Sequence, residues 1–236
     1  MAKLLFNIVR GARTVKHARK FTRLGKHCRF PGKYLDVQGH VELGDNCRFR
    51  DNVTLQAKPG GRIIFGTYSG CSYYCRIVAS HYVQIGRFTG IAEFTMVTDT
   101  GTNVMGSEDA WCETPPVILP VVIGDSCMIA SRCYIGPGVA IGDGAVLAPG
   151  TVVTRDVGPY EVWAGNPARK IAHRTKNVPR MMQERYRALL ETVGLKKARR
   201  GYDDQDVRVA AADGKNRSAE QRDKILKEMG IQQPRL

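Results

Sequence analysis

The chain has 236 residues, of which 43% are hydrophobic and 25% are charged. This composition is typical of a folded domain and excludes wholesale disorder, and no apolar run approaches the roughly 18 residues that a membrane-spanning helix needs. The charge is less ordinary, because 36 Lys and Arg residues against 22 Asp and Glu residues give a formal net charge of +14, which predicts a polyanionic partner.

The positive charge is concentrated at the two ends of the chain. Residues 1–30 carry +9, residues 31–173 carry −2 and residues 174–236 carry +7. A protein that binds nucleic acid more often carries its basic stripe on the folded body, so this distribution argues against a nucleic-acid partner. It also suggests three segments: a basic N-terminal flank (1–30), a central domain (31–173), and a C-terminal helix with a basic tail (174–236).

Residues 1–26 combine apolar and basic positions in a helical pattern. Leu4, Leu5, Ile8 and Val15 fall on one face of a helix, with Lys and Arg elsewhere. Two roles fit this pattern. The helix could lie on an anionic membrane surface, or it could cap the open end of a solenoid or contact another subunit. The segment lacks the apolar core and cleavage site of a secretory signal.

A six-residue period organises the centre of the chain. Each unit starts with an aliphatic residue, and a small residue and turn formers follow it. Six consecutive units start at Ile123, Ile129, Ile135, Ile141, Leu147 and Val153. The same frame returns with interruptions upstream, at Leu43, Phe49, Val53, Leu55, Phe65, Cys71, Ile77, Ile85, Ile91 and Val97. One such unit cannot bury its aliphatic side chain alone, whereas stacked units can, so the period predicts an all-β solenoid.

The repeat is followed by the sequence Ala-Gly-Asn-Pro-Ala-Arg at residues 164–169. Together with the six-residue period, this ending resembles the hexapeptide-repeat acyltransferases over residues 36–173, in particular their xenobiotic, galactoside and polysaccharide O-acetyltransferase branch. The resemblance implies a left-handed parallel β-helix with α-helical flanks, a homotrimer, and acetyl-CoA as co-substrate with no metal. It further implies acetyl transfer to a sugar hydroxyl in surface polysaccharide biosynthesis, in the cytoplasm or at the inner face of the membrane.

The repeat is interrupted at residues 99–118, which predict a loop of about 20 residues leaving the solenoid. Such a loop is a candidate functional site because ordering it costs entropy. In the family that the chain resembles, this loop covers an acceptor site between subunits, and most members carry a catalytic His at its start. Here residues 98–100 are Thr-Asp-Thr and the loop contains no His. A second hypothesis is therefore a non-catalytic CoA-binding or assembly trimer.

His81 and Asp99 are the candidate catalytic residues. Three units make one coil, which would stack His81 beside Asp99, and two extra residues at Val83 and Gln84 would move it towards Thr100. A His–Asp pair can activate a hydroxyl. The alternative is that His81 is a hydrogen-bonded turn residue.

Other residues are candidates for the base and for the acceptor. A partly buried carboxylate at Asp99 or Glu93 could also serve as the base. Thr100, Asn103 and Trp111 are candidate acceptor-binding residues, with Trp111 either stacking on a sugar ring or anchoring the loop.

The resemblance also places the cofactor. Small residues would let the pantetheine arm approach the backbone, at Ala130, Ser131, Ala148 and Pro149. Asn166, Arg169 and Lys170 match the positions near the CoA phosphates, and two adjacent cations suit that role. The alternative is that Asn166-Pro167 only ends the coil stack and that both cations belong to the surface.

The seven cysteines mostly occupy the small, half-buried place of the repeat. The sequence has no Cys-x-x-Cys pair, so we expect free buried thiols in a reducing cytosol rather than a zinc site or disulfides. A zinc enzyme on the same coil would need three His ligands, whereas His81 is the only His between residues 41 and 172.

The C-terminal flank predicts two helices and a solvated tail. The first begins at Pro179 and ends at Gly194. The second spans residues 218–229, because Ser218 and Gln221 have the spacing of a capping box and Gly230 can end a helix.

Overall fold

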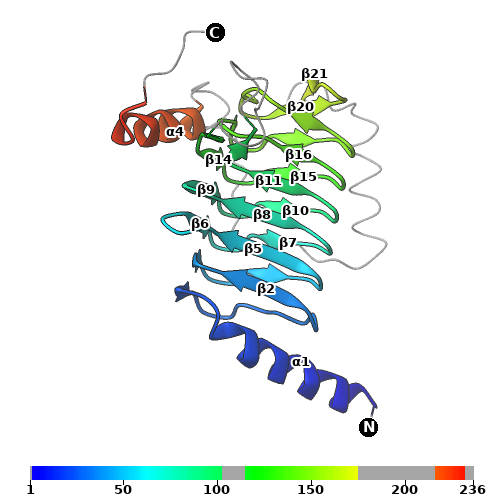
Figure 1. Cartoon of the computed structure of the whole chain (residues 1–236). Coiled ribbons are helices and arrows are strands. Elements are labelled where there is room, and N and C mark those ends of the chain that lie inside the picture. The colour runs from blue at the N-terminus through cyan, green and yellow to red at the C-terminus, as the bar shows by residue number, and fades with distance from the viewer. Residues whose placement is uncertain (1, 103–114, 175–215, 232–236) are drawn as a thin grey trace, which may run out of the picture.

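The computed structural model of the chain describes residues 2–102, 115–174 and 216–231. Short strands stack into a parallel solenoid, with helix α1 (Ala2–Ala18) at its N-terminal end and helix α4 (Arg217–Glu228) beside its C-terminal coils (Figure 1). The stacking confirms the all-β solenoid of the left-handed β-helix class that the six-residue period and the resemblance predicted.

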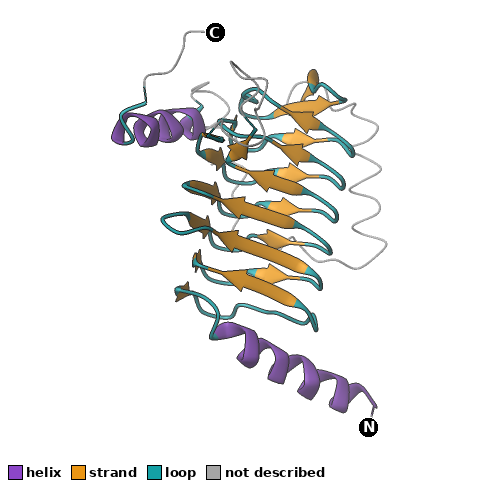
Figure 2. Cartoon of the chain, in the orientation of Figure 1, coloured by secondary structure: helices purple, strands orange, loops and turns teal. Residues whose placement is uncertain are grey.

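Three parallel sheets form the faces of the solenoid (Figure 2). Face I comprises β2 (Leu35–Gln38), β5 (Val53–Ala57), β8 (Arg76–Ala79), β11 (Met96–Thr98), β16 (Tyr134–Ile135) and β19 (Val152–Val153). Face II comprises β1 (Arg23–Leu24), β3 (His40–Leu43), β6 (Arg62–Phe65), β9 (Tyr82–Ile85), β14 (Val121–Ile123) and β17 (Ala140–Ile141). Face III comprises β4 (Arg48–Phe49), β7 (Gly70–Cys71), β10 (Gly90–Ile91), β15 (Met128–Ile129), β18 (Val146–Leu147), β20 (Glu161–Ala164) and the antiparallel β21 (Arg169–His173).

The chain runs from face I to face II to face III and then back to face I. We name the three edges of the solenoid corner I–II, corner II–III and corner III–I. Two further strands, β12 (Thr100–Gly101) and β13 (Val117–Ile118), pair antiparallel where the long loop leaves corner I–II.

The core is the ladder of aliphatic residues that the period placed inside. Residues that open units three apart, and so one coil apart, stand in register, as Ile123 does with Ile141 and Ile135 with Val153. Both pairs are fully buried, and each such side chain contributes about 1.5–3 kcal/mol of hydrophobic stabilisation. The prediction of free buried thiols is confirmed for the cysteines in the described residues, which are Cys28, Cys47, Cys71, Cys75, Cys127 and Cys133.

Two coils in the N-terminal half of the solenoid are longer than the C-terminal coils, and the added residues lie at corner I–II. Leu55 pairs with Ile77 across one coil, whereas Ile135 pairs with Val153 across a shorter one. The additions are the turn at residues 58–61 and the turn at residues 80–81, which falls between β8 and β9. Placing the second addition at Val83 and Gln84 was therefore wrong. Both residues lie within β9, and Val83 is part of the core.

Helix α1 contacts the first coil through its C-terminal half. Arg13 donates to the carbonyl of Pro31 (3.3 Å), Thr14 accepts the N–H of Phe30 (3.2 Å), and His17 is buried. This half of the helix therefore caps the coil stack, one of the two predicted roles. Strand β1 and a bridge between Arg29 and Arg48 lie before residue 31, so the first incomplete coil begins within the predicted flank.

Helix α4 packs against β14 and β17 of face II. Its N-cap is Asn216, whose side chain accepts the N–H of Ala219, so the prediction of Ser218 as the cap was wrong. Gln221 instead pairs with Gln84 of β9. The helix predicted at residues 179–194 lies outside the described residues, and no helix among those described is long and apolar enough to cross a membrane.

Candidate active site

Asp99 lies at corner I–II, where the long loop begins, and its carboxylate is completely buried. Oδ1 accepts hydrogen bonds from the N–H of Ser80 (2.8 Å) and the hydroxyl of Thr100 (2.9 Å). Oδ2 accepts from the N–H groups of His81 (2.7 Å) and Tyr82 (2.8 Å). These four donors match the roughly four lone-pair sites of a carboxylate, so Asp99 is placed to fix the turn that carries His81 rather than to take a proton.

The structure brings His81, Asp99 and Thr100 together, as the coil arithmetic predicted, but the contact differs from the predicted one. Asp99 binds the backbone N–H of His81 and not its imidazole. The carbonyl of His81 accepts the N–H of Arg62 from the coil below (2.9 Å). With its main chain held on both sides, His81 can present a half-exposed ring that has no hydrogen-bond partner within the described ranges.

Ser80 is a residue of this corner that sequence reasoning missed. Its hydroxyl oxygen lies 2.6 Å from that of Thr100, within hydrogen-bond distance, and its N–H donates to Asp99. Ser80 precedes His81 at the point where the coil departs from the six-residue frame. That departure was the available signal, and placing the extra residues at Val83 and Gln84 concealed it.

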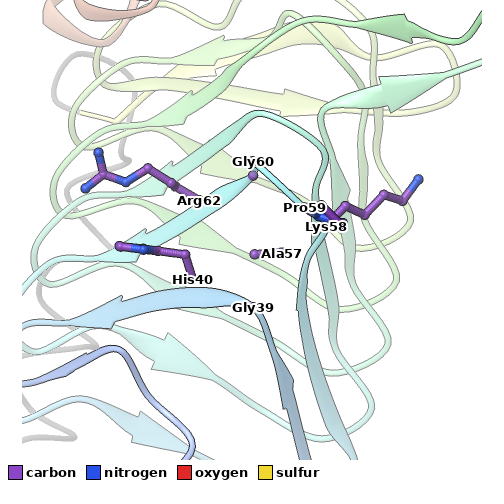
Figure 3. A pocket seen from close by; sticks show the side chains of 8 residues that line it. Gly39, His40, Ala57, Lys58, Pro59, Gly60 and Arg62 are labelled. Atoms are coloured by element: carbon purple, nitrogen blue, oxygen red, sulfur yellow. The ribbon is translucent and has the colours of Figure 1, made fainter.

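A cavity of about 520 Å³ lies on the same corner, directly below His81. Its wall is formed by backbone around the turn at residues 58–61 and by Gly39 (Figure 3). His40 and Arg62 extend to one side of it and Lys58 to the other (Figure 3). Glu42 binds both His40 (2.7 Å) and Arg62 (2.8 Å), and these hydrogen bonds hold the pKa of the Glu42 carboxyl below its usual value.

The predicted pantetheine residues form one column along corner III–I. Gly150 donates to the carbonyl of Ser131 (2.9 Å), and Ala130 donates to Leu147 (3.0 Å), so consecutive coils stack closely here. Val152 in turn donates to the carbonyl of Gly165 (3.0 Å), which places the segment around Asn166 at the top of the column. Ala130, Ser131, Ala148, Pro149 and Asn166 are therefore neighbours along this edge, and none of them is fully buried. Their role in binding pantetheine stays a prediction.

Arg169 and Lys170 stand at the start of β21, beside β20. Lys170 pairs with Glu161 (2.6 Å), and Arg169 donates to the carbonyl of Ala168 (2.9 Å) while its side chain lies at the surface. Burial would raise the pKa of Glu161, but hydrogen bonds from Lys170, Trp163 and the N–H of Gly158 lower it overall. An anion bound here would therefore interact directly with Arg169, whereas it would have to compete with Glu161 for Lys170.

Other predicted residues lie elsewhere. Asn103 and Trp111 are outside the described residues. Glu93 lies at corner III–I, where its carbonyl accepts the N–H of Arg132 (2.9 Å), so this candidate base is on a different edge from the loop. In the described ranges no three His, Cys, Asp or Glu side chains group closely enough to hold a metal ion.

Comparison with known proteins supports the repeat and the fold. The family of bacterial transferase hexapeptides (six repeats) matches residues 120–155. No curated protein matches the sequence. Among solved structures, AntD, an N-acyltransferase from Bacillus cereus in complex with dTDP and 3-hydroxybutyryl-CoA, aligns with a TM-score of 0.60 and 20% identity over 77% of this chain and 96% of AntD.

Two further solved structures have the same fold. A hexapeptide-repeat-containing acetyltransferase from Vibrio cholerae O1 biovar eltor, complexed with acetyl-CoA, has a TM-score of 0.51 and 21% identity over 74% of this chain and 86% of that one. A galactoside acetyltransferase in complex with CoA has a TM-score of 0.51 and 23% identity over 73% and 78%. The chain thus has a hexapeptide-repeat β-helix fold, which these CoA-bound acyltransferases also have.

Proposed function

We propose that the protein is a CoA-dependent acyltransferase that moves an acetyl group from acetyl-CoA to a hydroxyl of a sugar, in the biosynthesis of a surface polysaccharide. The observation that carries this proposal is corner I–II, where buried Asp99 holds the turn that presents His81 at the start of the long loop. The shared fold with proteins that bind CoA or acyl-CoA supports it.

The chemistry needs one base and close placement of the two substrates. The imidazole of His81 takes the proton of the acceptor hydroxyl as its oxygen attacks the thioester carbonyl carbon. The carbon–sulfur bond then breaks, and the leaving thiolate receives that proton from the imidazolium. Asp99 and Thr100 are positioning residues in this scheme, because they fix the backbone of the turn. No step requires a metal ion.

The arrangement of the two corners favours a site shared between copies of the chain. His81 lies at corner I–II, whereas the pantetheine column of Ala130 and Ala148 lies at corner III–I, at the opposite ends of the face I strands. One chain therefore separates its own base from its own cofactor column. A neighbouring copy can bring the two together, and we accordingly propose the homotrimer that the resemblance implies.

The N-terminal flank suits an acceptor at an anionic membrane surface. Residues 1–30 carry +9, and the Val15 side chain on the exposed side of α1 is 63% exposed. A basic helix with exposed apolar residues binds anionic lipid. We propose a cytoplasmic protein that contacts the inner face of the membrane through residues 1–26. Binding to vesicles with anionic lipid, and not to neutral vesicles, tests this part.

A second acceptor class is the amino group of a nucleotide-linked sugar. The observation that favours it is the structural similarity to AntD, an N-acyltransferase with dTDP bound. A neutral amine attacks the thioester carbonyl by the same route and, like the hydroxyl, gives up one proton that ends on the leaving thiolate, so His81 would serve either acceptor.

The test is CoA release from acetyl-CoA with a panel of hydroxyl and amino sugars as acceptors. We expect turnover with at least one sugar and a loss of at least about 100-fold in His81→Ala, the usual contribution of a general base. The matched control is His40→Ala, two coils lower on the same corner. Unchanged turnover in His81→Ala would remove the site assignment, and acetyl-CoA binding without turnover on any sugar would favour the non-catalytic CoA-binding trimer.

A further inference from the structure

Face III carries a trough that borders the predicted pantetheine column, with Ala130 and Ser131 common to both. Its strands align one outward residue from each coil, in the order Arg48, Gly70, Gly90 and Met128. Arg48 and Met128 are exposed side chains, whereas the two positions between them have none. The result is a hollow of about 590 Å³ over β7 and β10, two strands that are labelled in Figure 1.

Close packing of the coils explains one of the two glycines on the floor of the trough but not the other. A Cβ atom at Gly70 would lie 1.9 Å from the carbonyl oxygen of Arg48, so close packing of the coils requires glycine there. A Cβ atom at Gly90 would meet nothing within 4 Å. Gly90 has no left-handed φ angle either. Glycine in a strand costs stability, and where packing does not demand it, it often marks the close approach of a ligand to the backbone.

One wall of the trough is an aromatic ridge at corner II–III. The rings of Tyr68 and Phe88 stack with centroids 5.2 Å apart and planes 7° from parallel. Both residues have φ near +60°, a conformation that Asn46, Ser126, Gly144 and Tyr160 adopt at the same corner in other coils. Small and polar side chains are the usual choice for this conformation. The aromatic Tyr160 at the equivalent place is buried, whereas Tyr68 is 50% exposed at the edge of the trough. The opposite wall is made of small residues, which are Ser72, Ala92, Ala130 and Ser131.

The charge of the trough is positive at one end. Arg48 and Arg50 line its N-terminal end beside Asn46, and among the residues that the structure describes no Asp or Glu lines the trough. Aromatic side chains and exposed glycine backbone give apolar contact for the C–H faces of a sugar ring, the serine hydroxyls can bond its hydroxyls, and arginine favours carboxylate or phosphate.

We propose that this trough binds a saccharide that carries an anionic group, with the sugar ring over Gly90 against Tyr68 and Phe88 and the anion at Arg48 and Arg50. Assigning that saccharide to the acceptor rests on the proposed function, whereas the binding itself does not. The shared chemistry is a sugar ring with a carboxylate or phosphate. Three sources fit it: a uronic acid unit of a polysaccharide, a sugar phosphate, and a nucleotide-linked sugar.

The experiment is titration calorimetry of the full chain with four probes: a glucuronic acid tetrasaccharide, galactose 1-phosphate, a dTDP-linked sugar and a neutral galactose tetrasaccharide. We expect at least one anionic probe to bind at millimolar or lower concentration and more tightly than the neutral one. Gly90→Met fills the trough without a backbone clash and should abolish that binding. Gly90→Ala, the matched control, should keep it and unfold at the same temperature as the wild type or higher.

Two further measurements separate the alternatives. Arg48→Gln should weaken the anionic probe by about tenfold or more, the scale of a charge-assisted hydrogen bond, and change neutral binding little. His81→Ala should leave saccharide binding intact. Loss of turnover in His81→Ala therefore tests the proposed acyltransferase function, and loss of binding in Gly90→Met tests the proposed saccharide trough. The proposal is overturned if no anionic saccharide binds, if Gly90→Met binds as the wild type does, if CoA displaces the saccharide from the trough, or if Gly90→Met changes the oligomeric state.

Discussion

The two corners at the ends of face I are built by opposite means. At corner III–I the coils above Ala130 repeat closely, with small side chains and backbone hydrogen bonds from one coil to the next. At corner I–II successive coils differ, with the turn at residues 58–61, the turn at Ser80 and His81, and then the long loop. The regular corner offers one continuous surface that suits an extended ligand. The irregular corner collects polar groups and fixes them through Asp99.

The largest effect that this difference predicts is at Asp99. Asp99→Ala would leave three N–H groups of a half-buried turn without an acceptor. Each is worth about 1–3 kcal/mol, so we expect a loss of about 3–5 kcal/mol in the free energy of unfolding. Turnover should also fall, because the turn that presents His81 is released. Asp99→Asn keeps one acceptor oxygen and should lose less. Chemical denaturation measures this, and wild-type stability in Asp99→Ala would show that the corner does not depend on the carboxylate.

A substitution at corner III–I, the regular corner, should change the affinity for acetyl-CoA and leave the stability of the fold nearly unchanged. Ala148→Phe adds a large ring at the surface of corner III–I, where the pantetheine arm is expected, so the Kd for acetyl-CoA should rise by about tenfold or more. The thermal midpoint should stay close to that of the wild type, because the side chain is not part of the core. Ala148→Ser, which repeats the chemistry of Ser131, is the control. Equal acetyl-CoA affinity in Ala148→Phe would place the cofactor elsewhere.

The contrast between the corners also explains what the sequence could predict. The period follows directly from the residues that open each unit, so the solenoid, its buried ladder and the column at Ala148 could be read from it. The contacts at corner I–II depend on where the extra residues fall. Their position between Ala79 and Tyr82 turns three N–H groups toward Asp99, and no repeat specifies that.

Contacts between distant segments were beyond sequence reasoning for a similar reason. Arg222 of α4 is buried, and it donates to the carbonyl of Gly138 (2.8 Å) and pairs with Asp156, which are far away in sequence. The trough at Gly90 was likewise hidden, because a glycine in a turn-rich repeat looks unremarkable until the space around its Cβ position is known.

The capping end of the solenoid should be sensitive to acid through His17. Burial, and then the charge of Lys20, lower the pKa of His17 below its ordinary value of 6.5. Below that pH the unfolded chain takes up the proton more readily than the folded chain does, so stability is retained above pH 6.5 and falls as the pH drops further. His17→Gln should weaken this dependence. Denaturation at pH 7.5 and pH 5 measures it, and an identical pH dependence in the variant would exclude His17 as the cause.

The smallest expected effect is on acetyl-CoA affinity at the C-terminal end of corner III–I, where Glu161 forms an ion pair with Lys170. Glu161→Gln keeps an acceptor oxygen for Trp163 and Gly158 and removes the negative charge beside Lys170. Partly exposed ion pairs contribute about 1 kcal/mol or less, so the stability should change little. If Arg169 and Lys170 hold the CoA phosphates, acetyl-CoA should bind a few-fold more tightly in Glu161→Gln and with a steeper salt dependence, since Lys170 no longer has a competing partner. Arg169→Gln should have the opposite effect on affinity. Weaker acetyl-CoA binding in Glu161→Gln would mean that both cations belong to the protein surface and not to the cofactor site.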